Sequence, residues 1–427
     1  MSAHTSAVML SAQPAGLRPV QLAWLAAAVF IVSAGYGALL PLLPGWVSSM
    51  MPGASVIEVA RHVGFLSGVY AAGVLVGAPL WGVVSDRAGR SRILIIGLVG
   101  YVASLLLLLV PGLTSVWGLY ALRGTTGFFV AAVVPVVSAL VAEHTLGEHR
   151  ARRFAWLGAM SLLGFLFGPG MIAVADWIAS WAGLGVLLPA FTARMVIVLS
   201  AVLGAVMMLG LSRTLPASGA SHAAVENECE GHTRVNAIAL WWLSGAVMFV
   251  LAGFELGIML QGQQHTSLSS RELALMFAEC SLVMLGINAL LFFTPLLKNT
   301  SARSLMGAGL ILAMVGLAVL AQHRSDAWMY LGVSLTAAGT GLVLPVISYL
   351  AAGASPQKLG ATMGGLAAAA SFGQTLGSSA GGWLFGALAQ RSFGWLILPL
   401  TLMLMLLLAR PVWWSVIPVK STRHPVN

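Results

Sequence analysis

Long apolar stretches, each bounded by charged or turn-forming residues, follow one another along almost the whole chain. A helix that crosses a bilayer needs about 20 mostly apolar residues. The pattern predicts twelve such helices and leaves no segment for a separate soluble core. The divisions are weakest within 154–212, which is apolar nearly throughout, and within 359–390, where Gly, Ala and Ser dominate. The predicted spans are 20–44, 63–85, 93–112, 114–142, 154–176, 194–212, 237–260, 272–297, 304–321, 327–352, 359–389 and 393–415.

Composition supports a membrane protein, because 59% of the residues are hydrophobic and only 8% are charged, against roughly 25% charged in soluble domains. The net charge of +9 comes from short loops between apolar runs, not from a basic stripe interleaved with aromatic residues. We therefore expect a lipid bilayer and no nucleic acid as partner. Cys229 and Cys280 form no disulfide framework, and the His, Glu and Cys residues of 222–232 match no defined metal site.

The basic residues also predict the orientation of the chain. With both termini in the cytoplasm, the inner loops and ends hold fifteen Lys and Arg residues and the outer loops hold five. A miscounted span would scramble this asymmetry, so the positive-inside rule favours the predicted topology. Arg123 is left inside a span.

An internal repeat divides the chain into halves. Pro-Val-Val-Ser-Ala-Leu-Val-Ala at 135–142 returns as Pro-Val-Ile-Ser-Tyr-Leu-Ala-Ala at 345–352, and Gly164 and Gly168 return at nearly the same offset as Gly373 and Gly377. Chance similarity between apolar helices is the alternative to duplication. We predict an all-α membrane protein of two pseudo-symmetric six-helix bundles, 1–212 and 237–427, joined by a cytoplasmic linker, 213–236. This layout is typical of alternating-access transporters.

The loop after the second span has the order Gly-x-x-x-Asp-Arg-x-Gly-Arg. Its residues are Gly82, Asp86, Arg87, Gly89 and Arg90. This order resembles the signature loop of the major facilitator superfamily, although Ser91 replaces the usual next basic residue. In that family the loop latches the cytoplasmic side and couples its closure to the opposite half. An ordinary basic loop is the alternative.

Three further segments resemble the twelve-span drug:proton antiporters of that superfamily. They are Gly35, Pro41 and Pro44 in span 1; Arg123 with Gly127 in span 4; and Gly164, Gly168, Pro169 and Gly170 in span 5. The resemblance implies a role for Arg123 in proton transfer and favours antiport over symport. Glycines four apart also form a groove for a neighbouring helix, so packing alone is the alternative for the span 5 pattern and the default for Gly373 and Gly377.

Three charges lie inside apolar runs: Arg123, Glu255 and Glu279. Each costs on the order of 2.5–3.5 kcal/mol if it is unpaired at mid-bilayer. From their places in the spans, all three lie roughly 8–14 Å below the outer surface. We expect either an Arg–Glu pair across the halves or a buried carboxylate that takes a proton from outside and releases it inside. In the alternative, one Glu forms a static pair and the other faces an outer vestibule.

The residues expected to line a substrate cavity are Tyr36, Asn288, Tyr349 and Gln374. Interhelical hydrogen bonding is the default reading for the two amides. Related multidrug antiporters often carry an acid in span 1, and this span 1 has none, so cationic drugs are not specifically favoured as substrates.

These patterns predict a proton-coupled antiporter that exports small drug-like molecules or metabolites by alternating access. A proton symporter that imports a metabolite is the first alternative, and a non-transporting sensor or scaffold is the second. The chain has no Walker loop, His-Glu-x-x-His or Gly-x-Ser-x-Gly motif, so we expect no enzyme and no cofactor beyond the proton gradient. We expect a monomer in the bacterial inner membrane, with protons and a small molecule as its ligands.

Overall fold

A computed structural model describes most of the chain. The described ranges are 17–110, 115–145, 147–181, 189–215, 233–234, 236–264, 270–294, 296–323, 325–352, 356–410 and 417–418. Most of the predicted linker, residues 216–232 and 235, and with it Cys229, lies outside these ranges.

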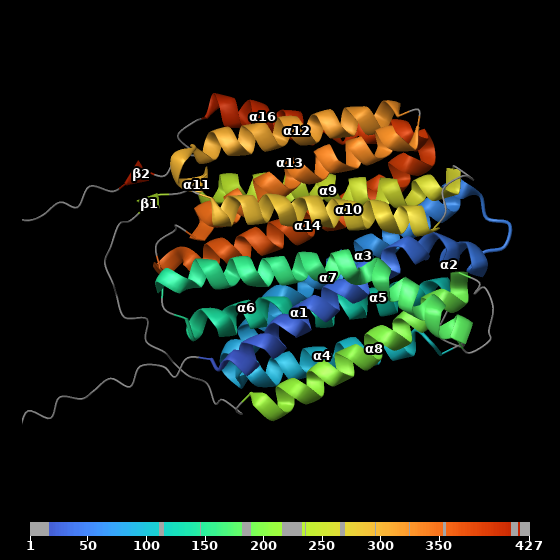
Figure 1. The fold of residues 1–427 in the computed structure, drawn as a ribbon, viewed down its shortest axis with the longest axis horizontal. Helices are drawn as coiled ribbons and strands as arrows, with labels where there is room; N and C mark the ends of the chain where they lie inside the picture. Colours follow the sequence, from blue (N-terminus) through green and yellow to red (C-terminus); the bar gives the residue numbers. More distant parts are fainter. Residues whose placement is uncertain are drawn as a thin grey trace, which may run out of the picture.

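Helices run side by side through the whole molecule. In Figure 1 those of the first half of the chain (blue to green) occupy the lower part, and those of the second half (yellow to red) the upper part. The first half contains α1 (Pro19–Leu39), η1 (Leu40–Leu42), α2 (Leu43–Met50), α3 (Val56–Ala88), α4 (Arg90–Leu107), α5 (Val116–Val130), α6 (Val134–Glu143), α7 (Gly147–Trp181) and α8 (Pro189–Thr214).

The second half has the same kind of architecture. Its helices are α9 (Ala237–Gln264), α10 (Ser270–Phe293), α11 (Leu296–Asn299), α12 (Ala302–Gln322), α13 (Asp326–Ala352), α14 (Pro356–Leu388), η3 (Ala389–Arg391), α15 (Ser392–Trp395) and α16 (Ile397–Ala409). A two-residue antiparallel ladder joins β1 (Thr233–Arg234), just before α9, to β2 (Ile417–Pro418), after α16.

Ten stretches in the described part of the chain are long and apolar enough to cross a membrane. The predicted twelve differ from these at two places. First, the apolar part of α10, Leu275–Leu291, is shorter than each of the ten stretches and is not counted among them. Second, Gly364–Ala409 counts as one stretch of 46 residues, because α14 to α16 follow one another without an interruption in hydropathy. The count of twelve spans stays a prediction.

Prolines explain why two crossing stretches contain more than one helix. Pro lacks the N–H that a helix interior needs. Pro41 and Pro44 accordingly fall where α1 gives way to η1 and α2, inside the single stretch Pro19–Met50. Pro135 is the second residue of α6, which follows a turn inside Val116–Val141. Pro169 instead lies within the continuous helix α7.

The repeated glycines make equivalent contacts in the two halves. A Cβ added at Gly168 in α7 would lie 2.7 Å from the backbone nitrogen of Ala38 in α1, and one at Gly164 would meet the carbonyl oxygen of Phe30. In α14, a Cβ at Gly377 would lie 2.7 Å from the Cα of Phe249 in α9. Each half therefore packs its first helix against a glycine face of a later helix, as the sequence repeat predicts.

Helices α3 and α14 bring the two halves together. A Cβ added at Gly64 would lie 2.8 Å from Gly382 Cα, and one at Gly68 would lie 3.1 Å from the carbonyl oxygen of Thr375 and would meet the hydroxyl of Ser379. We call these five residues the α3–α14 seam. Toward the opposite ends of the same helices, Gly82 and Gly364 have no such neighbour within 4 Å in the described structure. The seam thus closes the end of the bundle where α3 begins.

Candidate functional site

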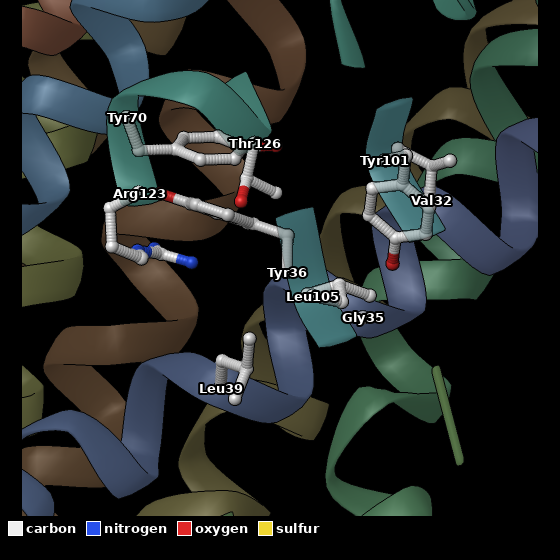
Figure 2. A pocket seen from close by; sticks show the side chains of 9 residues that line it. All are labelled: Val32, Gly35, Tyr36, Leu39, Tyr70, Tyr101, Leu105, Arg123 and Thr126. Carbon is white, nitrogen blue, oxygen red and sulfur yellow. The ribbon is translucent and has the colours of Figure 1, made fainter. Parts of the chain in front are cut away.

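Arg123 lies among α1, α3, α4 and α5 (Figure 2). Its side chain is 1% exposed, and its guanidinium carbon lies 4.8 Å from the centre of the Tyr70 ring. Among the residues that the structure describes, nothing accepts a hydrogen bond from its Nε or Nη2. A buried cation without an anionic partner is costly, so the face of the Tyr70 ring supplies part of the compensation.

A small pocket adjoins this guanidinium. Figure 2 shows Arg123, Tyr36 and Tyr70 grouped on one side and Tyr101 on the other. Tyrosine hydroxyls can donate or accept hydrogen bonds, so the pocket is polar at several points inside an apolar bundle. Its lining residues are Val32, Gly35, Tyr36, Leu39, Tyr70, Tyr101, Leu105, Arg123 and Thr126.

Tyr36 connects this pocket to the other half of the chain. Its ring stacks on that of Tyr70, with the centroids 4.8 Å apart and the planes inclined by 26°. Its hydroxyl accepts a hydrogen bond of 3.3 Å from the Nε2 atom of Gln374 in α14. Two of the four predicted cavity residues are therefore in direct contact across the halves.

The two acids, Glu255 in α9 and Glu279 in α10, belong to the second half of the chain and are half-buried. Tyr36 interacts electrostatically with both Glu255 and Arg123, and Cys280 does so with both Glu255 and Glu279. No described carboxylate forms an ion pair with Arg123. Of the two arrangements expected from the sequence, the described structure therefore does not contain the direct Arg–Glu pair, and the proton-carrying carboxylate stays a prediction.

Glu279 has a partner within the second half. The hydroxyl of Ser334 in α13 donates a hydrogen bond to its Oε1 atom, while Oε2 is buried and has no partner among the described residues. This hydrogen bond lies within the second half and does not involve Arg123. Glu255 is the acid that interacts electrostatically with Tyr36, a residue lining the Arg123 pocket.

The signature loop forms its ion pair internally. Arg90 Nη2 lies 3.2 Å from Asp86 Oδ1, one helical turn away. Gly89 has a φ of 95°, a conformation that side chains other than glycine rarely adopt. It ends α3 and lets α4 begin at Arg90, and Arg87 is exposed beside the pair. The loop is built as a tight, charged turn.

Asn288, Tyr349 and the glycines of the antiporter motif do not line the Arg123 pocket. Asn288 donates to the backbone oxygen of Met284 in its own helix at 2.8 Å, so this bond is intrahelical and not the interhelical one that the default reading expects. Tyr349 is 46% exposed and does not line the pocket. In the antiporter motif, Gly170 has no neighbour within 4 Å of an added Cβ in the described structure, unlike Gly164 and Gly168.

Sequence reasoning missed Tyr70, Tyr101 and Thr126. They lie in apolar runs where an aromatic residue usually packs as core, so nothing in their spacing marks them as site residues. One signal was available: Tyr70 and Tyr101 are two of only 6 tyrosines in a chain of 427 residues.

The fold and this site define a helical membrane protein with ionisable groups enclosed between its two halves. The chain belongs to the Major Facilitator Superfamily, whose family model matches residues 25–292. It is therefore a multi-pass membrane transporter for small molecules and not an enzyme.

Curated relatives include tetracycline and multidrug resistance proteins. The class D tetracycline resistance protein of Salmonella ordonez is 26% identical over 372 residues, which cover 85% of this chain and 89% of that protein. The class B protein of Escherichia coli is 34% identical over 135 residues, about a third of each chain. Multidrug resistance protein 2 of Bacillus subtilis is 25% identical over 269 residues, 62% of this chain and 64% of that protein.

A solved structure has the same fold. The human organic anion transporter MFSD10 (TETRAN) superimposes with a TM-score of 0.69 and 19% sequence identity, over 91% of this chain and all of that one.

Proposed function

We propose that this protein is a proton-coupled antiporter that exports small drug-like molecules or metabolites by alternating access. In this proposal twelve spans form two bundles, 1–212 and 237–427, that rock against each other with both termini in the cytoplasm of a bacterial cell. The protein works as a monomer in the inner membrane and needs no cofactor beyond the proton gradient.

The observation that carries the proposal is the link from Arg123 through Tyr36 to Glu255. Tyr36, in the first half, lines the pocket beside Arg123 and interacts electrostatically with Glu255 in the second half. Intramembrane ionisable residues of this kind mark proton relays or substrate pathways. Rocking of the halves changes the distance between these groups, so the affinity of Glu255 for a proton depends on which side is open.

The relatives support export over import. Their printed names assign tetracycline or multidrug resistance, and resistance by a membrane transporter is efflux. For this chain the substrate class is a proposal, and tetracycline serves as the first probe.

Everted membrane vesicles test the direction of coupling. An inside-acid gradient drives tetracycline into everted vesicles if the protein is an antiporter, and the accompanying proton efflux relieves the quenching of a pH-sensitive dye. Glu255→Gln abolishes both signals, while Tyr349→Phe, a change at an exposed tyrosine outside the pocket, leaves both intact. A panel of norfloxacin, ethidium and organic acids extends the assay.

The two rival functions give different results. A symporter loses a preloaded compound from the same vesicles when their interior is acidified. A non-transporting scaffold moves none of the compounds with or without the gradient, and Asp86→Asn and Arg123→Met then have no effect on resistance or flux.

A further inference from the structure

The guanidinium of Arg123 has hydrogen-bond donors without an acceptor along one of its edges. They are its Nε and Nη2 atoms, which are buried and have no partner among the described residues. The Nε–H bond and one Nη2–H bond of a guanidinium point in parallel, so this edge matches the two oxygens of a carboxylate or phosphate. Figure 2 shows the guanidinium pointing toward the space bounded by Tyr36 and Leu39.

The pocket at this edge contains a positive charge and no negative one. None of its nine lining residues is acidic, and α1 contains neither Asp nor Glu. Two carboxylates of the first half are bound elsewhere, Glu58 to Ser55 and Asp86 to Arg90. Because a buried cation without an anion is costly, an anionic group that enters this pocket is favoured over a neutral one of the same shape.

Tyr36 supplies a further donor at the boundary with the second half. Its oxygen accepts the 3.3 Å hydrogen bond from Gln374, while its own O–H has no acceptor among the described residues. The pocket has room for about one water-sized group. It therefore admits only the tip of a charged group in this conformation, and full entry requires the second half to withdraw from Tyr36.

We propose that Arg123 binds a carboxylate of the exported molecule through its Nε–Nη2 edge, with Tyr36 as a second donor, so that the substrates are organic acids. The inference rests on the proposed function, because it assigns a substrate class to an exporter. It also explains the acid-free span 1, since a carboxylate there would occupy Arg123 and repel the ligand. The body of the ligand lies between the two halves, outside the pocket.

Direct binding to the purified protein in detergent tests the charge preference without a proton gradient. The probes are norfloxacin, nalidixic acid and naphthoic acid, each compared with its primary amide, which has nearly the same shape and no carboxylate charge. At neutral pH the three carboxylic acids are ionised. Calorimetric titration should give at least one acid a dissociation constant about ten- to a hundredfold below that of its amide, the size expected for hydrogen bonds to a charged group.

Variants at the pocket assign this preference to its donors. Arg123→Gln removes the charge and abolishes the preference, while Arg123→Lys keeps the charge without the paired edge and retains only part of it. Tyr36→Phe, which keeps the ring that stacks on Tyr70, weakens binding of the acid several-fold and leaves the buried charge in place. Arg61→Gln is the matched control, because it makes the same change at an exposed arginine outside the pocket and leaves the preference intact.

Equal affinities for every acid and its amide overturn the inference, and so does a preference that survives in Arg123→Gln. Chloride tests the other source of an anion. If chloride alone raises the thermal stability in an Arg123-dependent way and no acid is preferred over its amide, the pocket is a site for inorganic anions and the role in substrate binding is overturned.

The transport assay separates this inference from the proposed function. If acids bind through Arg123 but no compound moves with a proton gradient, the proposed function fails while the anion site stands. If tetracycline is transported with the gradient but acids bind no better than amides, only the organic-acid assignment fails.

Discussion

At the scale of single residues, the main feature is a cation surrounded by aromatic rings. Arg123 is buried, has its guanidinium over Tyr70, and has no carboxylate beside it among the described residues. Arginine suits this place better than lysine, because its planar, weakly hydrated group stacks on a ring face while an ammonium demands hydration. In the proposed function this charge stays fixed while the carboxylate of Glu255 gains and loses its proton.

Two replacements of Arg123 therefore separate the effect of its positive charge from the effect of its planar, stacking shape. We expect Arg123→Met to abolish gradient-driven transport, because no fixed charge remains to favour ionised Glu255. Arg123→Lys keeps the charge but loses the stack, worth about 1–2 kcal/mol, so roughly a tenth of the wild-type rate should remain. Initial rates in everted vesicles measure both, and equal rates for the Lys and Met variants would contradict the role of the charge.

The two half-buried acids differ in their partners, so their variants should differ as well. Glu279 accepts a hydrogen bond from Ser334 within the second half. We expect Ser334→Ala to lower the unfolding free energy by about 1 kcal/mol, and Glu279→Gln to retain most of the proton coupling that Glu255→Gln loses. Thermal unfolding in detergent and dye-based proton flux are the measurements. A full loss of coupling in Glu279→Gln would move the proton carrier to Glu279.

At the scale of helices, close approach through glycine holds α7 on α1. A Cβ at Gly168 would overlap the backbone of Gly37 and Ala38, and backbone cannot give way as a flexible side chain can. Gly170, two residues on, is exposed, and an added Cβ there meets nothing within 4 Å in the described structure. The motif thus combines a packing glycine with one that makes no contact in this conformation.

This contrast gives a matched pair of variants. Gly168→Ala should destabilise the protein by about 1–3 kcal/mol through overpacking, while Gly170→Ala should be neutral or stabilising by up to about 1 kcal/mol through helix propensity. Thermal unfolding of the two purified variants checks the difference. If Gly170→Ala abolishes transport without lowering stability, that glycine has a role in another conformation.

Much of the helix arrangement could be predicted from the sequence. Apolar periodicity located the helices, and the repeat correctly paired Gly164 and Gly168 with Gly373 and Gly377, because their spacing reflects a packing need that both halves share. The breaks at η1 and between α5 and α6 follow from prolines. The hydrogen bond between Tyr36 and Gln374 could not be predicted, because it depends on how two helices more than 300 residues apart in sequence are placed in space.

At the scale of the whole molecule, closure at one end is the feature that defines the conformation. The α3–α14 seam is tight, while the opposite ends of the same helices carry glycines that face open space. In the predicted orientation, the tight end of these two helices lies on the outer side. The sequence predicts two halves that rock, but which end is closed depends on contacts that only the folded molecule contains.

A bulky residue in the seam should hold it open. Gly64→Trp places an indole where Gly382 Cα lies, whereas Gly82→Trp extends into open space and serves as the control. Ser67, buried between Gly64 and Gly68, reports the change when it is replaced by cysteine in a background without other cysteines. We expect a membrane-impermeant maleimide to label Ser67→Cys several-fold faster with Gly64→Trp, and no faster with Gly82→Trp.

The chemistry of the seam has one more consequence. Its five residues are glycines, a serine, a threonine and no charged side chain, so closure there depends on close packing and not on ion pairs. Screening by dissolved ions acts on charges and leaves such contacts almost untouched. Packing at this end should therefore change little with ionic strength, and any dependence of efflux on ionic strength would arise elsewhere, at sites such as the Asp86–Arg90 pair.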